Sequence, residues 1–572
     1  MKIVIVCDVD VESGRGPVTR LASVLEGLSR RAEIVLVALG APDSVCREAI
    51  ARSGCRVHVV ELAWAGWSLR NLRDVVQGIE RIAESESADL VVLYREIWDL
   101  ARTLSESCAR LGVPFLLMPH SMPFLDAVAR PSRSFLADFA RHLARERRPH
   151  ALRYMIKHVH EYRLMRTLPR VAINETVEAY LDNYFPQPRT VRAVPGYATE
   201  PVGADAGDKL YDLAFMAKLS EPKGIFETLE VLRRVRRTRP GARMVVIGSF
   251  EDDRVEREFK KRVAEAGLGE AVDLADWLSG PEKYRILSTA RVFCYPSISA
   301  DTFSLCLLEA LSCGLPAVCY DVPFVRAVYR TPAVRRVPLR DRDAMADEVV
   351  NLLSSGRDTA LVRHARSFAG QYASWDAVAE AEFQAYRAFL GAQPGVPPLS
   401  DRTAAVVVLG RRTTQEQAGD TLRVLSRTKG LDLVVVDDGV DSGVAQVLAD
   451  QAPQDVAIVT HVRVRGLRDA LLSGLRKSGA RRAVLLEAGP GIPSLPSPAI
   501  ADDSGLAVIA RSDDWRADPN CLIGLAGDHA DLARLLDRSH RNVNLRRLAL
   551  RAERDRAVPL IPPRSQGGPE HV

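Results

Sequence analysis

Two carboxylates, separated by a polar loop and the start of a helix, are the residues of this chain best suited to chemistry. Asp301 lies eight positions before Glu309 in the segment 295–321, YPSISADTFSLCLLEALSCGLPAVCYD. The apolar spacing predicts a strand that ends at Tyr295, a helix that begins close to Leu305, and a second buried strand after that helix.

The start of this predicted helix is suited to binding an anion. Backbone N–H groups at a helix N-terminus lack partners within the helix and bind phosphates. Here these groups belong to Phe303, Ser304 and Leu305. Asp301 lies just before the helix and Glu309 about a turn and a half inside it, and carboxylates accept hydrogen bonds from sugar hydroxyls. The combination suits a sugar joined to a diphosphate. The alternative is an ordinary βαβ crossover with an N-capping aspartate.

Two lysines follow another predicted strand and open the next helix. Lys218 and Lys223 lie in the segment AKLSEPKG. Two ammonium groups at such a place neutralise a diphosphate leaving group, as a metal ion does elsewhere. A solvated pair of loop lysines is the alternative.

Two further loops follow buried strands. His120 comes directly after the predicted strand 114–118, and Gly14 and Gly16 follow the predicted strand 3–7. Ligands of open α/β sheets bind outside the carboxyl ends of the strands. A surface-loop histidine and a plain tight turn are the respective alternatives.

The spacing Asp301-x7-Glu309, with Pro-Ser before it and LEALSCGLP after it, resembles the E-x7-E signature of retaining GT-B glycosyltransferases. The closest group is family 4, the glycogen-synthase and sucrose-synthase-like type. Asp301 stands where the family has Glu, and Thr302-Phe303-Ser304 stands where it has Gly-Phe-Gly. The resemblance covers about residues 1–390, with several motifs in the same order.

The resemblance implies a role for each candidate residue. The loop with Gly14 and Gly16 faces the donor phosphates and the acceptor, and His120 contacts the donor sugar. Lys218 and Lys223 stand where the family has Arg and then Lys. The loops that carry Gly248 and Trp277 resemble the nucleotide-base pocket, where Trp277 either stacks on the base or packs in the core.

Composition is that of an ordinary globular protein. The 572 residues are 47% apolar and 26% charged, with a net charge of +5, and the length suggests about three domains. The nine cysteines are scattered and contain no C-x-x-C pair, which favours a reduced, cytoplasmic protein without a metal site. We expect no signal peptide and no membrane-spanning segment.

Continuous apolar strands alternate with amphipathic helices, which predicts parallel sheets covered on both faces. The expected fold class is α/β, of the GT-B type, with two Rossmann-like domains facing across a cleft and a smaller C-terminal α/β domain. The expected domains are an N-terminal acceptor domain (1–195), a nucleotide-sugar domain (196–371), a closing helix (372–390) that packs back on the first domain, a linker (391–401), a shortened domain (402–540) and a tail (541–572).

The region 402–540 resembles a shortened nucleotide-binding half of a family 2, GT-A glycosyltransferase. Glu487-Ala488-Gly489 stands where that family has its metal-binding Asp-x-Asp. One carboxylate holds a divalent ion less well than two. We therefore expect this domain to be non-catalytic, with a docking or regulatory role.

Basic residues are concentrated in the segment 130–170, interleaved with apolar ones. Such a stretch can dock on anionic lipid at the inner face of a membrane, and a solvated helix face is the commoner explanation. Nucleic-acid binding is not expected, because no recognised motif accompanies the charge.

The predicted function is a retaining bacterial glycosyltransferase that uses a nucleotide-diphosphate sugar, without a metal or other cofactor. The acceptor would be a glycan or a lipid-linked glycan of a cell-surface polysaccharide or glycoconjugate. The alternatives are a non-catalytic GT-B scaffold, or another GT-B enzyme such as a sugar-nucleotide epimerase or a phosphorylase.

Overall fold

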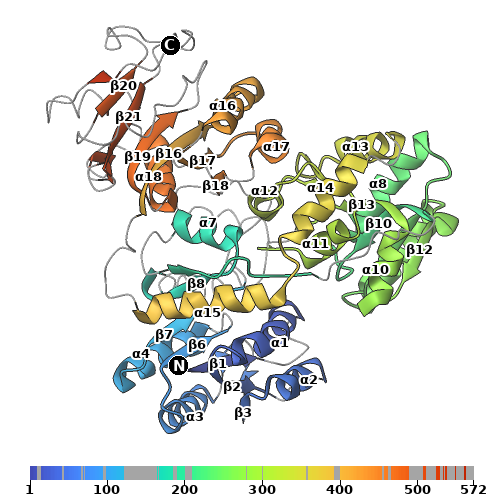
Figure 1. The fold of residues 1–572 in the computed structure, drawn as a ribbon. Helices are drawn as coiled ribbons and strands as arrows, with labels where there is room; N and C mark the ends of the chain where they lie inside the picture. The colour runs from blue at the N-terminus through green and yellow to red at the C-terminus, as the bar shows by residue number, and fades with distance from the viewer. Residues whose placement is uncertain are drawn as a thin grey trace. The chain divides into compact units, whose positions relative to one another are not determined.

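The computed structural model describes most of the chain (Figure 1). The described residues are 1–8, 15–40, 44–62, 64–65, 68–69, 71–94, 98–120, 164, 166–184, 190–199, 209–278, 280–298, 301–355, 359–391, 400–428, 430–453, 456–461, 466–478, 480–487, 507–510, 523–528, 532–533, 535–536, 548 and 560–561. The chain divides into two compact units. The first holds most of residues 1–393, and the second is built mainly from Pro394–Val572.

The first sheet of the larger unit is parallel throughout, with the strand order β3-β2-β1-β6-β7-β8-β9. Its central strands are buried on both faces, which explains their unbroken apolar sequences. The strands are β1 (Lys2–Asp8), β2 (Glu33–Leu39), β3 (Arg56–Val60), β6 (Leu90–Leu93), β7 (Phe115–Leu117), β8 (Arg170–Ala172) and β9 (Thr190–Arg192). The helices are α1 (Arg15–Ser29), α2 (Ser44–Ser53), α3 (Leu72–Ser85), α4 (Trp98–Leu111) and α7 (Glu175–Tyr184), and a two-stranded sheet joins β4 (Trp64–Ala65) to β5 (Ser68–Leu69).

The second sheet of this unit is also parallel, with the order β12-β11-β10-β13-β14-β15. Its strands are β10 (Tyr211–Met216), β11 (Met244–Ile247), β12 (Val272–Ala275), β13 (Ala290–Tyr295), β14 (Ala317–Tyr320) and β15 (Val334–Val337). The helices are α8 (Ile225–Thr238), α9 (Asp253–Glu265), the 3₁₀ turn η2 (Gly269–Ala271), α10 (Gly280–Ser288), α11 (Leu305–Ser312), α12 (Pro323–Val328), α13 (Arg342–Ser354) and α14 (Thr359–Gly370).

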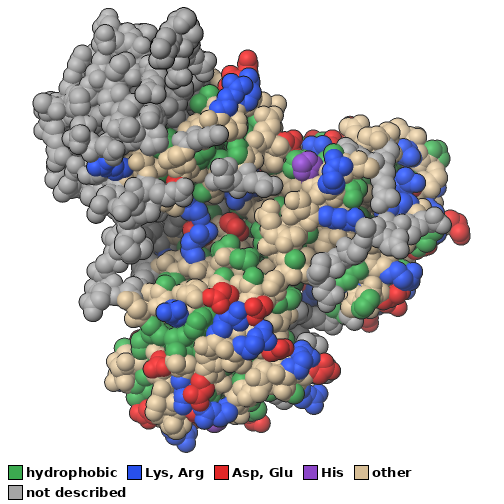
Figure 2. Space-filling view, viewed as in Figure 1, with side chains coloured by type: hydrophobic (Ala, Val, Ile, Leu, Met, Phe, Trp, Pro, Cys, Tyr) green, Lys and Arg blue, Asp and Glu red, His purple; other side chains and the backbone are tan. Residues whose placement is uncertain are grey.

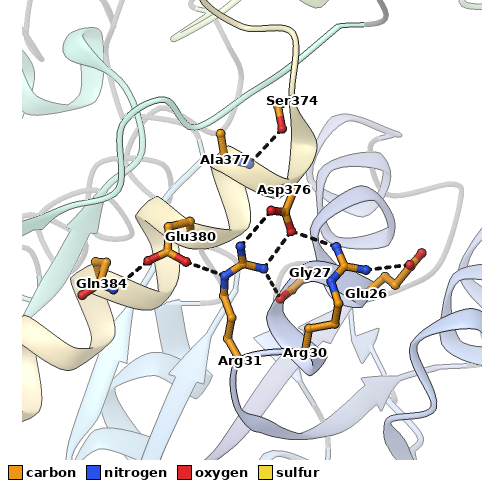
Figure 3. Close-up of polar contacts among 9 residues, drawn as sticks. All are labelled: Glu26, Gly27, Arg30, Arg31, Ser374, Asp376, Ala377, Glu380 and Gln384. Carbon is orange, nitrogen blue, oxygen red and sulfur yellow. Dashed lines mark hydrogen bonds and ion pairs between the residues drawn. The ribbon is translucent and has the colours of Figure 1, made fainter.

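Helix α15 (Trp375–Gly391) follows the second sheet in sequence but packs on α1 of the first (Figure 3). A Cβ at Gly27 would lie 2.6 Å from the Cβ of Ala379, so the glycine permits the close approach of the two helices. Arg31 donates to both carboxylate oxygens of Asp376 at 2.7 and 2.8 Å. It also donates to Glu380 at 2.5 Å.

The smaller unit contains a third sheet, with the order β18-β17-β16-β19-β21-β20-β22. Side chains of β16 alternate between two apolar cores: Val406 and Val408 face one, and Val407 and Leu409 face the other. The strands are β16 (Ser400–Gly410), β17 (Asp432–Asp438), β18 (Ala457–Thr460), β19 (Ala480–Glu487), β20 (Ala507–Ala510), β21 (Ile523–Asp528) and β22 (Leu560–Ile561), and the helices are α16 (Gln415–Arg427), α17 (Ser442–Gln451) and α18 (Leu467–Ser478). Strand β21 is antiparallel to both of its neighbours.

The predicted alternation of apolar strands and helices is present: the strands expected at 3–7 and 114–118 are β1 and β7, and the strand, helix and strand expected across 295–321 are β13, α11 and β14. Elements of the larger unit that the sequence analysis did not specify include β4, β5, α7, α12, α13, α14 and β15. Strand β16 begins at Ser400, inside the range expected for the linker, and most of the tail 541–572 lies outside the described residues. The domain boundaries stay predictions.

The charge on the surface is mixed. On the face shown in Figure 2, basic and acidic side chains of the described residues are interspersed, in keeping with the small net charge. Among the described residues, no helix is both long enough and apolar enough to cross a bilayer.

Candidate active site

The carboxylate-bearing segment has the predicted local structure. Strand β13 ends at Tyr295, and α11 runs from Leu305 to Ser312. The Ser304 hydroxyl caps α11 by accepting a hydrogen bond from the backbone N–H of Leu307 at 3.3 Å. Glu309 is therefore the fifth residue of the helix, and Asp301 precedes its cap by three positions. The two carboxylates thus flank a helix N-terminus.

Lys223 contacts the first of these carboxylates. Its Nζ donates to Asp301 Oδ1 at 2.6 Å and also to Oδ2, and the two side chains are 25% and 18% exposed. Burial by itself would lower the pKa of the Lys223 ammonium, but Tyr295 and the Asp301 carboxylate outweigh burial and raise it. Lys223 therefore stays charged at neutral pH, next to the candidate sugar-binding carboxylate.

A glycine fixes the position of the loop that carries Lys223. Gly224 has a φ of +91°, and a Cβ there would lie 2.4 Å from the carbonyl oxygen of Pro296. Only glycine accepts this backbone conformation and this approach without strain. The lysine loop thus packs directly on the segment between β13 and α11.

Glu309 also has a lysine partner, which the sequence analysis missed. Lys283, in the first turn of α10, donates to Glu309 Oε1 at 2.6 Å. The two side chains are 17% and 15% exposed. The position of Lys283 in the chain could have indicated this contact. Helix α10 begins soon after β12 ends, and the carboxyl ends of β12 and β13 lie on the same edge of one parallel sheet.

His120 lies close to the same segment. The Thr302 hydroxyl donates to the His120 carbonyl at 3.0 Å, and Asn174 Nδ2 lies 3.4 Å from that hydroxyl. His120 is only 8% exposed, and the centroid of its ring lies 5.1 Å from the centroid of the Tyr94 ring. The alternative of a surface-loop histidine is therefore wrong. Asn174 is a second neighbour that the sequence analysis did not identify.

The segment 196–197, at the expected boundary between the first two domains, also contacts this region. The ring of Tyr197 stacks on that of Phe303, with centroids 4.4 Å apart and an angle of 15° between the planes. The Gly196 carbonyl accepts a hydrogen bond from Arg20 Nε at 2.6 Å. The Phe303 ring therefore packs on the Tyr197 ring, and the Phe303 backbone directly precedes Ser304, the N-cap of α11.

Arg20, Glu382, Tyr94 and Tyr386 form a buried network of ionic and hydrogen-bonding groups near His120. Arg20 and Glu382 are both 0% exposed, and their charged groups lie 2.7 Å apart. The Tyr94 hydroxyl contacts both side chains, and the Tyr386 hydroxyl donates to Glu382 at 2.5 Å. This network joins α1, the end of β6 and α15, and it includes Tyr94, whose ring lies beside that of His120.

The remaining candidates are Lys218 and the two residues expected in the base pocket, Gly248 and Trp277. Lys218 is 59% exposed and donates to Glu251 at 3.0 Å. Gly248 has a φ of +142°, and a Cβ there would lie 2.0 Å from the Ala217 carbonyl, so glycine is required where β10 and β11 end. Trp277 is 55% exposed, so the alternative that it packs in the core is wrong.

Some expected features lie partly or wholly outside the described residues. Gly14 is among these, whereas Gly16 lies in the first turn of α1. The basic segment is described only at residues 164 and 166–170. Its last member, Arg170, is 0% exposed in β8, which corrects its assignment to a solvated or lipid-facing surface.

In the smaller unit, Glu487 ends β19, and Ala488 and Gly489 lie outside the described residues. No cluster of three or more His, Cys, Asp or Glu side chains suited to a metal ion occurs in the described part of the chain.

Comparisons with known proteins find similar sequences and a similar fold. Residues 202–365 match the family model "Glycosyl transferases group 1". The chain is 28% identical over 141 residues to a phosphatidyl-myo-inositol mannosyltransferase of Mycobacterium leprae, covering 24% of this chain and 36% of that protein. It is 26% identical over 300 residues to a D-inositol 3-phosphate glycosyltransferase of Segniliparus rotundus, covering 49% and 62%.

The chain thus spans between a third and two thirds of the length of these relatives. A solved structure of Anabaena HepE in complex with UDP matches the fold with a TM-score of 0.51 at 11% identity, covering 68% of this chain and 100% of that one. The two parallel Rossmann-like sheets of the larger unit match GT-B structures, and residues 202–365 carry a domain of the glycosyl transferases group 1 type.

Proposed function

We propose that this protein is a retaining glycosyltransferase that moves a sugar from a nucleotide-diphosphate donor to a glycan or lipid-linked acceptor. The observation that carries this proposal is the grouping of Lys223, Asp301 and the Ser304-capped start of α11. A cation, a hydroxyl-binding carboxylate and a helix N-terminus together match the chemistry of a sugar diphosphate.

Each group has a proposed role. Lys223, Lys218 and the N–H groups at Phe303, Ser304 and Leu305 hold the diphosphate. For Lys218 this requires the exposed ammonium to leave Glu251, a surface pair worth little energy. Lys223 already lies beside the segment, so it is the principal cation.

The carboxylates and His120 bind the rest of the donor. Glu309 accepts hydrogen bonds from the ribose hydroxyls, and Asp301 accepts them from hydroxyls of the sugar. His120 positions the sugar, and Gly248 and Trp277 lie by the base. The side chain of Asp301 is one methylene shorter than Glu, so it has a shorter reach toward the sugar than the family's residue.

The transfer step needs no protein base. The bond from the anomeric carbon to the diphosphate breaks as the acceptor oxygen forms a new bond to that carbon on the same face. The departing phosphate oxygen takes the acceptor's proton. Lys223 and the start of α11 stabilise the charge that develops on the diphosphate, so no metal is required on this proposal.

The relatives favour a lipid-linked or inositol-type acceptor, because their names include phosphatidyl-myo-inositol and D-inositol 3-phosphate. Such an acceptor fits a cytoplasmic enzyme at the inner face of a bacterial membrane. The C-terminal unit would then have a docking or regulatory role as a non-catalytic, GT-A-like domain.

A product assay with a panel of nucleotide sugars tests the proposal. Release of a nucleoside diphosphate together with a new glycoside of unchanged anomeric configuration is the expected result. An isomerised donor would indicate an epimerase, and a sugar phosphate would indicate a phosphorylase. If calorimetry detects no binding of any nucleotide sugar, the result favours the non-catalytic scaffold.

The matched variants are Glu309→Gln and Glu256→Gln. Both residues accept from a lysine at 2.6 Å, but Glu256 lies on the surface of α9. We expect Glu309→Gln to reduce turnover at least tenfold and Glu256→Gln to leave it unchanged. Equal turnover in the two variants would contradict the role of Glu309.

A further inference from the structure

The ion pair between Lys283 and Glu309 differs from the surface pairs of this domain. Its two side chains are 17% and 15% exposed, whereas those of Lys260 and Glu256, at the same distance of 2.6 Å, are 62% and 38% exposed. The attraction in an ion pair that is shielded from water is screened less than in an exposed pair. A shielded pair therefore restrains the orientation of its two side chains more strongly.

Two contacts fix the start of α10, from which Lys283 extends. The Tyr284 hydroxyl lies 3.4 Å from Thr199 Oγ1, close in sequence to the segment 196–197. The Tyr284 carbonyl contacts the thiol of Cys313 at 3.8 Å, at the end of α11. The ammonium of Lys283 also lies 4.8 Å from the centre of the Tyr284 ring. The part of α10 from which Lys283 extends is therefore held by contacts that do not involve the Glu309 side chain.

The charge state of Lys283 supports a lasting contact. Burial alone would lower the pKa of its ammonium, but Glu309 outweighs burial and raises it. The ammonium is thus charged throughout the neutral range, and one carboxylate oxygen, Oε1, is directed toward α10.

We propose that Lys283 is a positioning residue for nucleotide recognition: it holds the Glu309 carboxylate in the orientation that reads the ribose hydroxyls of the donor. This inference rests on the proposed role of Glu309. Without Lys283, the partly buried carboxylate loses this ion pair and leaves the ribose-binding orientation. A charge-assisted hydrogen bond to a ribose hydroxyl is then lost.

The test compares ribose with dideoxyribose, so that it isolates the hydroxyl contact. Calorimetry measures the Kd of UDP, GDP and their 2′,3′-dideoxy forms for the wild-type full chain, Lys283→Met, Lys283→Arg and the surface control Lys260→Met. Methionine keeps most of the apolar volume of the lysine side chain, and thermal unfolding of each variant reports whether it remains folded.

We expect the wild type and Lys260→Met to bind the ribose form of the accepted nucleotide at least tenfold more tightly than its dideoxy form. In Lys283→Met this ratio should fall to about one, with the dideoxy Kd changed less than threefold, and Lys283→Arg should restore most of the ratio.

Three results would overturn the inference: an unchanged ratio in Lys283→Met, an equal weakening of both nucleotide forms, or a wild type that binds nucleotide without distinguishing ribose. If Lys283→Met unfolds, the test uses the folded Lys283→Arg instead, and the ratio of its dideoxy Kd to its ribose Kd decides whether the inference holds. Absence of all nucleotide binding by the wild type would instead refute the proposed function.

Discussion

The buried ion pair between Arg20 and Glu382 provides a sharp test of how α15 is held on the first sheet. Both side chains are 0% exposed, and the charged groups are 2.7 Å apart. In Glu382→Leu the guanidinium stays charged, because arginine does not lose its proton in proteins. An uncompensated buried charge destabilises the native state by about 3–5 kcal/mol.

Hydrogen exchange of the full chain, followed by mass spectrometry, measures this loss locally. The relevant peptides are those of β1 and β6, which form the centre of the sheet. A loss of about 3–5 kcal/mol accelerates exchange roughly 10²- to 10⁴-fold, because each 1.36 kcal/mol is a factor of ten.

Two further variants separate charge from packing. Arg20→Met combined with Glu382→Leu removes both charges and should recover most of the lost protection, since apolar replacement of a buried pair is often neutral. Arg30→Ala breaks exposed pairs with Glu26 and Asp376, whose side chains are about half exposed, and the loss of each pair should cost less than about 1 kcal/mol. Unchanged exchange in Glu382→Leu, or a double variant as unprotected as the single one, would refute the reasoning.

Three other changes test the packing, the charges and a helix start. Gly474→Ala should destabilise the smaller unit by about 1–3 kcal/mol, because the new Cβ would lie 2.3 Å from Val406 Cγ1. Gly410→Ala is the control, since no atom lies within 4 Å; the exchange of β16 peptides measures both. Arg31 and Arg30 lower the pKa of Asp376. The ionised carboxylate therefore stabilises the fold fully above the ordinary aspartate pKa of about 3.9. This contribution is lost as the pH falls through the lowered pKa. Asp376→Asn should therefore cost under about 1 kcal/mol at pH 7 in urea unfolding, with a deficit that shrinks below about pH 4; a constant deficit would contradict the assignment. Ser304→Ala removes the α11 cap and should reduce stability by about 0.5–2 kcal/mol, seen as faster exchange in α11 peptides, and unaltered exchange there would show that the cap contributes little.

The sequence alone determined the order and type of most elements of residues 1–320, because each buried parallel strand is a short, continuous apolar run and each helix has its own periodicity and caps. It also placed Asp301 before α11 and Glu309 inside it, since that spacing is local. The predicted strand before His120 likewise put this residue at the carboxyl end of β7.

Only the tertiary structure decided which distant side chains meet. Lys283 reaches Glu309, and Arg20 reaches Glu382, because separate helices pack at those points, and no local pattern records such a pairing. The same holds for burial: Arg170 is enclosed and Trp277 is exposed, although their residue types suggest the reverse. Periodicity encodes the elements, whereas the partners of each charge depend on how those elements are assembled.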